Sequence, residues 1–213
     1  MSATRRSTTA LIRQSDDPTF AAILDAAVRV IGARGYHGTS VRDIADEAGV
    51  SAGSLYNHFG SKHELLVVIL DRGLDDLINA TEQALYDSTP DPASRLMALV
   101  AAHVSNHAQG RLESYIGNSE LRSLSAEARA LIVSKRDTQQ RMFDRVVRDG
   151  VRQQVFHASD PQMASRFVVT ACTAVATWYR PGGRFSVPEL IDQYQQLALR
   201  TVGYREEESD AAV

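Results

Sequence analysis

The 213-residue sequence contains a single cysteine, Cys172. One thiol cannot form a disulfide within the chain, and it cannot build a zinc site from cysteine ligands. Its place in an apolar run should raise the pKa of the thiol and lower its reactivity. The cysteine usage therefore predicts a cytoplasmic protein without internal cross-links.

Long apolar runs are also missing. The longest nearly apolar stretch, "FVVTACTAVA" at 167–176, is too short for the roughly 20 residues that span a bilayer. The N-terminus lacks the apolar core of a signal peptide. We therefore expect no membrane partner.

The chain has no large excess of charge of one sign. Its formal net charge is −3 and its isoelectric point is about 6.1, so any basic surface that binds nucleic acid must be local. Three arginines and no acid lie within residues 1–15, whereas the last nine residues contain four acids and one arginine. We expect a flexible basic tail at 1–17 and an acidic tail at 205–213, with phosphate contact by the basic tail as an alternative.

Strand signals are absent as well, because the sequence has no clear alternation of apolar and polar residues and no Asn-Gly or Asp-Gly pair between two such alternating runs. Helix starts are frequent: Asp-Pro pairs and Ser-x-x-Asp/Glu capping boxes recur along the chain. With 44% hydrophobic residues the chain can bury a sizeable core. We predict an all-α fold of about nine helices, near 18–34, 40–48, 51–58, 61–87, 91–108, 112–123, 125–154, 160–180 and 186–203.

The stretch "SVRDIADEAGVSAGSLYNHFGSK" runs from Ser40 to Lys62. Ser40 is expected to cap one short helix, Gly49 to end it in a left-handed conformation, and Ser51 to cap the next. Two short helices joined by a tight glycine turn form a helix-turn-helix. The second helix of such a unit lies in the major groove of DNA, so 51–58 is the predicted reading helix.

The longer stretch "ILDAAVRVIGARGYHGTSVRDIADEAGVSAGSLYNHFGSKHELL" resembles the TetR family of bacterial repressors over about Phe20 to Leu66. The G-T/S-x-x-D-I-A, A-G-V-S and G-x-L-Y-x-H-F-x-x-K-x-E-L elements stand in the family's order and spacing. The resemblance implies an all-α homodimer with a DNA-binding domain at 18–64. It also implies an effector-binding and dimerisation domain at 65–204 and a repressor that a small molecule releases from a palindromic operator.

The resemblance also assigns DNA contacts. Thr39, Tyr56 and Lys62 match the family's phosphate contacts, Arg42 is placed to reach phosphate or a base edge, and the remainder lie on or beside the reading helix. Each has a structural alternative, such as helix capping by Ser51. The candidates are Thr39, Ser40, Arg42, Ser51, Ala52, Ser54, Tyr56, Asn57, His58 and Lys62. Because charges balance over residues 1–64, we expect modest non-specific affinity for DNA.

Two segments of the second half, "SELRSLSAEARALI" and "TWYRPGGRFSVPELIDQYQQLALRTV", resemble a TetR subgroup tied to fatty-acid and steroid catabolism. Some members of that subgroup sense acyl-CoA thioesters, so the resemblance implies an acyl-CoA or related lipid as effector. The arginines of 125–154 form either a basic mouth for such an anion or a solvated face. The main alternative is a multidrug-type repressor that senses a neutral or cationic hydrophobic compound.

Candidate ligand contacts are spread over the second half of the chain: His103, His107, Tyr115, Arg122, Arg136, Arg141, Phe143, Thr173, Thr177 and Arg180. Helices 160–180 and 186–203 should pair with a second copy in an isologous four-helix interface. The candidate interface residues are Val169, Ala176, Trp178, Tyr179, Ile191, Tyr194, Leu197 and Leu199. For Trp178 and Tyr179, packing at the interface competes with a role near the ligand.

Signals for catalysis are weak. His103 and His107 are spaced i, i+4 and could hold a metal from one helix face, but no third ligand is evident beyond Glu113 or His157. No G-x-S-x-G elbow, phosphate-binding loop or dinucleotide-binding glycine pattern is present. We therefore expect neither a catalytic site nor a metal or other cofactor, and an enzyme or a purely DNA-bending protein stays a remote alternative.

Overall fold

A computed structural model describes residues 17–205, which contain helices and no strand. The predicted all-α class is confirmed within this range, and the predicted tails lie outside it apart from Asp17 and Arg205. The elements in chain order are α2 (Pro18–Arg34), α3 (Val41–Glu47), α4 (Ala52–His58), α5 (Lys62–Asp87), α6 (Pro92–Gln109), α7 (Arg111–Ser119), the 3-10 helix η1 (Leu121–Ser123), α8 (Ala126–Arg152), α9 (Pro161–Trp178) and α10 (Val187–Thr201).

Side-chain caps explain most helix starts. Asp17, Asp91 and Asp160 each accept a main-chain N–H of the first turn, and each precedes a proline at the first helical position. Ser40 and Ser186 form complete capping boxes. The box predicted at Ser61 is only half formed, because the Glu64 carboxylate accepts the N–H of Gly60, one residue before the cap.

The predicted helix at 112–123 is shorter in the structure. α7 ends at Ser119, and Glu120 leaves the helical conformation with φ −102° and ψ 9°. Its carboxylate accepts the main-chain N–H of Tyr36 at 3.2 Å and the hydroxyl of Ser123 at 2.8 Å. A contact between segments 84 residues apart therefore sets the end of this helix.

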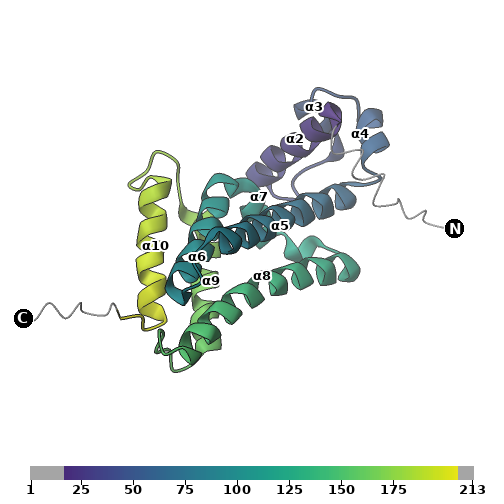
Figure 1. Ribbon diagram of the computed structural model, residues 1–213. Coiled ribbons are helices and arrows are strands. Elements are labelled where there is room, and N and C mark those ends of the chain that lie inside the picture. Colours follow the sequence, from purple (N-terminus) through teal and green to yellow (C-terminus); the bar gives the residue numbers. More distant parts are fainter. Residues whose placement is uncertain (1–16, 206–213) are drawn as a thin grey trace, which may run out of the picture.

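The helices form two connected units (Figure 1). α2, α3 and α4 gather around the beginning of α5, and α6 and α8 pack against α5 further along the chain. α9 packs on α6 and α8, and α10 packs on α6. The first core is centred on Phe20, Ile23 and Leu55 and continues past residue 64 through Leu65 and Leu70 of α5. It also includes Ile116 of α7 and Ile132 of α8, which pack with the N-terminal unit. α5 and α7 therefore connect both halves of the chain.

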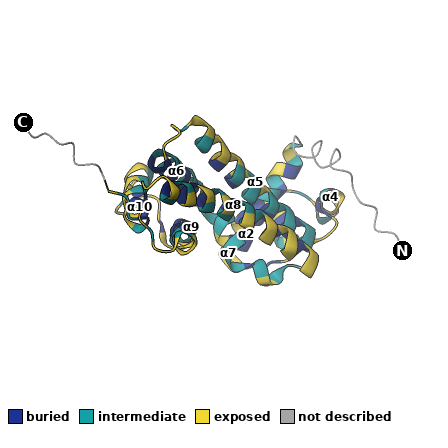
Figure 2. Cartoon of the chain, turned by 60° about the horizontal axis from the view of Figure 1, so that its bottom comes forward, coloured by how far each residue is buried: buried dark blue, intermediate teal, exposed yellow. Residues whose placement is uncertain are grey.

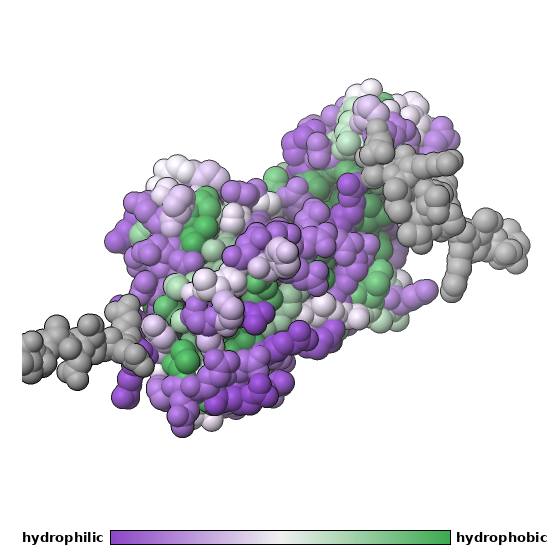
Figure 3. Space-filling model, in the orientation of Figure 1, coloured by the Kyte–Doolittle hydropathy of each residue, from purple (hydrophilic) through white to green (hydrophobic). Residues whose placement is uncertain are grey.

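The surface is mostly polar. Figure 3 shows hydrophilic side chains over most of one face, with hydrophobic ones in small separate areas. Within residues 17–205, no helix combines the length and the apolar composition that crossing a membrane requires.

Candidate functional site

α3 and α4 form a helix-turn-helix at one end of the molecule, and α4 lies at the outer edge (Figure 1). Gly49 occupies the turn with φ 69°, a conformation that side-chain-bearing residues rarely adopt. Ser51 caps α4 by accepting the N–H of Ser54 at 3.0 Å. Leu55 anchors the inner face of α4 in the core, so the opposite face is turned outward.

The outward face carries several of the predicted DNA contacts. Tyr56 is 51% exposed, and Ser51, Asn57 and Arg42 are also exposed. Ala52, Ser54 and His58 are partly buried. The His58 imidazole packs edge-on against Phe20 at 6.4 Å between ring centroids, on the side of α4 that faces α2.

Thr39 and Lys62 are placed differently from the expected phosphate contacts. The Thr39 side chain is 2% exposed, and its hydroxyl donates to the Gly35 carbonyl at 2.9 Å. The Lys62 ammonium donates to the carbonyls of Tyr36 and Thr39 at 2.9 and 2.6 Å and lies 4.2 Å from the centroid of the Tyr36 ring. In this structure both side chains therefore hold the turn between α2 and α3. Ser40 caps α3, as expected.

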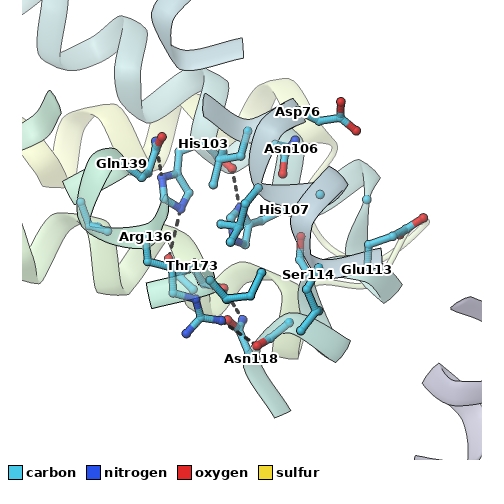
Figure 4. A pocket seen from close by; sticks show the side chains of 18 of the residues that line it. Asp76, His103, Asn106, His107, Glu113, Ser114, Asn118, Arg136, Gln139 and Thr173 are labelled. Atoms are coloured by element: carbon cyan, nitrogen blue, oxygen red, sulfur yellow. Dashed lines mark hydrogen bonds between the residues drawn. The ribbon is translucent and has the colours of Figure 1, made fainter. Parts of the chain in front are cut away.

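A cavity of about 350 Å³ lies among α5, α6, α7, α8 and α9. Leu74 and Leu77 of α5 and Ile132 of α8 give it an apolar wall. Much of the remaining lining is polar, and Figure 4 shows its polar side chains around the cavity. This volume falls within the range of small-molecule sites. Its charged lining residues are Asp76, Glu113, Asp137, Arg136 and Arg166.

Two histidines of α6 lie side by side at this cavity. His103 is 1% exposed and His107 is 5% exposed, and their rings stack at 4.5 Å. Burial lowers the pKa of His103 well below its usual value. Burial also lowers the pKa of His107 to about 4, and the nearby Arg136 guanidinium contributes to this shift. Both rings are therefore neutral at pH 7.

Hydrogen bonds fix the roles of these rings. His103 Nε2 lies 3.1 Å from the Thr173 hydroxyl, and His103 Nδ1 lies 3.4 Å from the Gln139 amide nitrogen. His107 Nδ1 lies 3.0 Å from the carbonyl oxygen of His103. Neither Glu113 nor His157 joins the pair in a cluster of three metal-binding side chains among the described residues.

The cavity contains four of the ten predicted ligand contacts: His103, His107, Arg136 and Thr173. Phe143 is buried behind His103, and its ring meets the imidazole edge-on at 5.7 Å. The other five predicted contacts do not line the cavity, and all five side chains are exposed. These five residues are Tyr115, Arg122, Arg141, Thr177 and Arg180.

Helical periodicity explains what the sequence interpretation missed on α8. Ile132, Arg136 and Gln139 recur at i, i+4 and i+7, and all three line the cavity. Arg141 lies on a different face of α8, where it donates to the Thr138 hydroxyl. Gln139 was not predicted, although its spacing from Arg136 was a usable signal. Asn106, Ser114 and Asn118 line the cavity too, and no sequence motif indicated them.

The predicted dimer residues divide into two groups. Trp178 and Leu197 are 45% and 56% exposed, and Ile191 and Tyr194 are half-buried. Ala176, Tyr179 and Leu199 are buried within this chain, and Val169 lines the cavity, so these four side chains already pack inside the protomer.

The predicted dimer residues do not include two large exposed apolar side chains of α9. Met163 is 63% exposed and Phe167 is 62% exposed, one turn apart on the outer side of the helix. Figure 2 shows exposed surface on α9 and α10 at the end of the molecule opposite α4. The chain therefore presents apolar side chains to solvent from both of its last two helices.

Two family models match the two halves of the chain, and a curated relative matches most of its length. A family model described as "Tetracyclin repressor-like, C-terminal domain" matches residues 89–202, and one described as "Bacterial regulatory proteins, tetR family" matches residues 23–69. The HTH-type transcriptional repressor KstR2 of Mycobacterium tuberculosis is 33% identical over 179 residues, which cover 83% of this chain and 89% of KstR2.

Solved structures agree with the family models. The structure of the ketosteroid transcriptional regulator KstR2 of M. tuberculosis has a TM-score of 0.81 and 30% identity, covering 90% of this chain and 97% of KstR2. AibR in complex with isovaleryl coenzyme A and operator DNA has a TM-score of 0.78 and 24% identity, covering 88% of this chain and 100% of AibR. At that identity the likeness to AibR concerns the fold.

Proposed function

Because this chain belongs to the TetR family of bacterial regulatory proteins, we propose that it is a transcriptional repressor that a small-molecule effector releases from a palindromic operator. The repressor is a homodimer whose two α4 helices enter successive major grooves, about 34–36 Å apart. The arginine and the tyrosine on the outward side of the helix-turn-helix, Arg42 and Tyr56, bind the phosphate backbone, and Asn57 reads base edges. The effector occupies the cavity among α5 to α9.

One observation carries this proposal: the same helix begins beside the reading helix and lines the cavity. α5 starts at Lys62, directly after α4, and its residues from Ile69 to Leu77 form a wall of the cavity. α7 makes a second connection, because Gly117 lines the cavity and Glu120 binds the main chain at Tyr36. A ligand that favours a different position of these helices thereby favours a different spacing of the two α4 helices.

The homodimer is supported by the exposed apolar side chains on α9 and α10. Phe167 and Trp178 on α9 and Leu197 on α10 are each at least 45% exposed in the single chain. An isologous interface lets each of these helices meet its counterpart across a twofold axis. Such pairing would remove their apolar surface from water.

For the effector we propose an acyl-CoA or a related lipid-like acid. The relative KstR2 is described as a ketosteroid regulator, and AibR was solved with isovaleryl coenzyme A. In this chain the apolar wall suits an acyl body, and Arg136 suits a carbonyl or carboxylate. The acids Asp76, Glu113 and Asp137 favour the second candidate, a neutral or cationic hydrophobic compound.

Release of operator DNA by matched compounds tests the proposal. The full chain is bound to its operator and titrated with decanoic acid, with decanoyl-CoA and with a neutral hydrophobic compound of similar size. We expect the acid or its thioester to release the DNA, and Arg136→Leu to weaken that release at least tenfold, because a guanidinium–carboxylate contact is lost. Release by the neutral compound alone would instead support the second candidate.

A further inference from the structure

We propose that the effector carries a hydroxyl group a few bonds from its acyl carbonyl, as in a 3-hydroxyacyl group. His107 selects this hydroxyl because its Nε2 accepts the hydrogen bond that the hydroxyl donates. The inference rests on the proposed role of the cavity as the effector site. It concerns which acyl compounds the cavity prefers.

The first argument is the tautomer of His107. Its Nδ1 lies 3.0 Å from the carbonyl oxygen of His103, and a carbonyl oxygen can only accept a hydrogen bond. Nδ1 therefore carries the proton and donates it. In the neutral ring Nε2 then has a lone pair and no hydrogen, so this nitrogen can only accept. The hydrogen bond from His107 Nδ1 to the His103 carbonyl, within α6, thus makes Nε2 a hydrogen-bond acceptor.

The second argument is the burial of this acceptor. The side chain is 5% exposed and lines the cavity, and no side chain of residues 17–205 donates to its Nε2. Burial and the adjacent Arg136 guanidinium both oppose protonation, while Asp76 of α5, Glu113 of α7 and Asp137 of α8 are the acids that line the cavity on the facing helices. Among the described residues, the fully buried side-chain atoms without a hydrogen-bond partner are Asp71 Oδ1 and Arg95 Nε, so His107 Nε2 is open to the cavity. A ligand hydroxyl can donate to Nε2 in place of solvent, whereas a ligand without a donor there leaves it unpaired.

The third argument is the contrast with the neighbouring groups. His103 has both ring nitrogens engaged by Thr173 and Gln139, so it has no free site for a ligand. Arg136 donates one N–H to the Gly117 carbonyl at 2.6 Å and keeps further N–H groups that can donate to a ligand. A ligand that pairs with both polar groups of the cavity therefore places a hydrogen-bond acceptor at Arg136 and a donor at His107 (Figure 4).

A 3-hydroxyacyl group satisfies both requirements. Its carbonyl oxygen accepts from Arg136, its hydroxyl donates to His107 Nε2, and its alkyl chain lies against Leu74, Leu77 and Ile132. The saturated acyl group leaves Nε2 unpaired. The 3-oxoacyl group places an acceptor opposite an acceptor. The order of affinity should therefore be hydroxyl, then saturated, then keto.

The test uses the full chain without DNA. Binding of 3-hydroxydecanoate, decanoate and 3-oxodecanoate, each as the free acid and as the CoA thioester, is measured by calorimetry at pH 7.5. We expect the hydroxylated compound to bind at least about tenfold more tightly than the saturated one in the form that the cavity accepts. Equal affinities, or no binding of any of the six compounds at millimolar concentration, would overturn the inference.

Two variants assign the preference to His107. His107→Phe keeps a flat ring and removes the acceptor, so the hydroxylated and saturated compounds should bind about equally. Leu74→Ala is the matched control: it lies on the apolar wall and should weaken both compounds while leaving their ratio unchanged. A preference that survives in folded His107→Phe overturns the assignment. In the unmodified protein, weaker binding of the 3-oxo compound than of the saturated one would also indicate an acceptor at His107.

The outcome is distinguishable from a failure of the proposed function. A hydroxyl preference in calorimetry without release of operator DNA would refute the effector role of the compound and leave the selectivity of the cavity standing. Release of DNA by saturated and hydroxylated acyl compounds at the same concentration would support the repressor proposal and overturn the role of His107.

Discussion

Tyr56 and Arg42 both face outward from the helix-turn-helix, but they carry different groups. The Tyr56 hydroxyl is neutral, so Tyr56→Phe should weaken binding to every DNA sequence by a similar factor, about tenfold, without changing the salt dependence. Arg42→Ala should weaken binding and also lower the salt slope by about one per protomer, since one fewer counterion is released. Binding isotherms at several salt concentrations measure both effects.

Tyr86→Phe is the control for this experiment, because Tyr86 is 85% exposed near the other end of α5. It should leave the affinity for DNA unchanged. A change of base preference in Tyr56→Phe, with the affinity for other sequences retained, would contradict the assignment to phosphate.

Gly150 of α8 lies against the ring of Phe156, which follows the end of that helix and is 1% exposed. A Cβ at Gly150 would lie 2.1 Å from Phe156 Cδ2. Gly150→Ala should therefore lower the free energy of unfolding by about 1–3 kcal/mol through overpacking. Gly73→Ala is the matched comparison, because its Cβ would meet nothing within 4 Å. It should raise stability by about 0.5–1 kcal/mol through helix propensity. Urea denaturation that gave both variants the same sign would contradict this account.

The sequence was informative where a residue acts on its immediate neighbours. The caps at Asp17, Asp91 and Asp160 were predictable because a carboxylate before proline binds the N–H groups next to it. The role of Glu120 was not, because its partner, the N–H of Tyr36, is 84 residues away. The hydrogen bond from the Thr39 hydroxyl to the Gly35 carbonyl was not predictable for a related reason, because that carbonyl becomes available only when α2 ends.

At the scale of elements, the helix-turn-helix was predictable to within a residue or two, since glycine and serine mark both ends of its helices. The cavity was only partly predictable. Helical spacing places Arg136 and Gln139 of α8 on one face, but which face borders the cavity depends on how α8 packs against α5 and α9. This packing is a property of the assembled bundle, and no local motif on α8 encodes it.

α9 and α10 present exposed apolar side chains that a second copy would cover. Leu197→Glu places a charge at a position that is 56% exposed in the single chain and central to the proposed interface. Burying that charge without a partner is costly, so the variant should be a monomer at micromolar concentration, where we expect the parent chain to be a dimer. Sedimentation velocity distinguishes the two.

The control for the dimer prediction lies on another helix. Leu131 of α8 is 46% exposed, so Leu131→Glu introduces the same charge on a comparably exposed leucine outside the proposed interface. It should leave the dimer intact. A monomer in both variants, or a dimer in both, would contradict the assignment of the interface to α9 and α10.

At the scale of the whole molecule, the two cores meet through α5, α7 and α8. Ile116 and Ile132 pack in the first core, yet Gly117 and Ile132 also border the cavity. The ion pairs of Lys135 with Asp71 and Asp75 join α8 to α5 in the same region. A ligand in the cavity therefore touches helices that also hold the DNA-binding unit, which is what coupling between two sites requires.

The buried histidines make the stability of the whole chain depend on pH. The pKa of His107 is about 4 in the folded chain, below the usual value of 6.5, and that of His103 is also well below it. Between pH 6.5 and 4 the unfolded chain therefore binds protons that the folded chain does not, and the free energy of unfolding falls as the pH falls. For His107 alone this amounts to about 3 kcal/mol across the interval.

His107→Phe removes one of these titrating groups, so it should flatten the fall in stability by up to about 1.4 kcal/mol per pH unit between pH 6.5 and 4. Gly73→Ala removes no titrating group and should leave the slope unchanged. Urea denaturation at pH 5, 6 and 7, at one protein concentration so that dimer formation is held constant, measures the three slopes. If His107→Phe kept the slope of the parent chain, His107 would have to be protonated in the folded chain at pH 5 and 6, as it is in the unfolded chain. Its Nε2 would then be a donor, and the cavity would favour an acceptor such as a keto or carboxylate oxygen at that position.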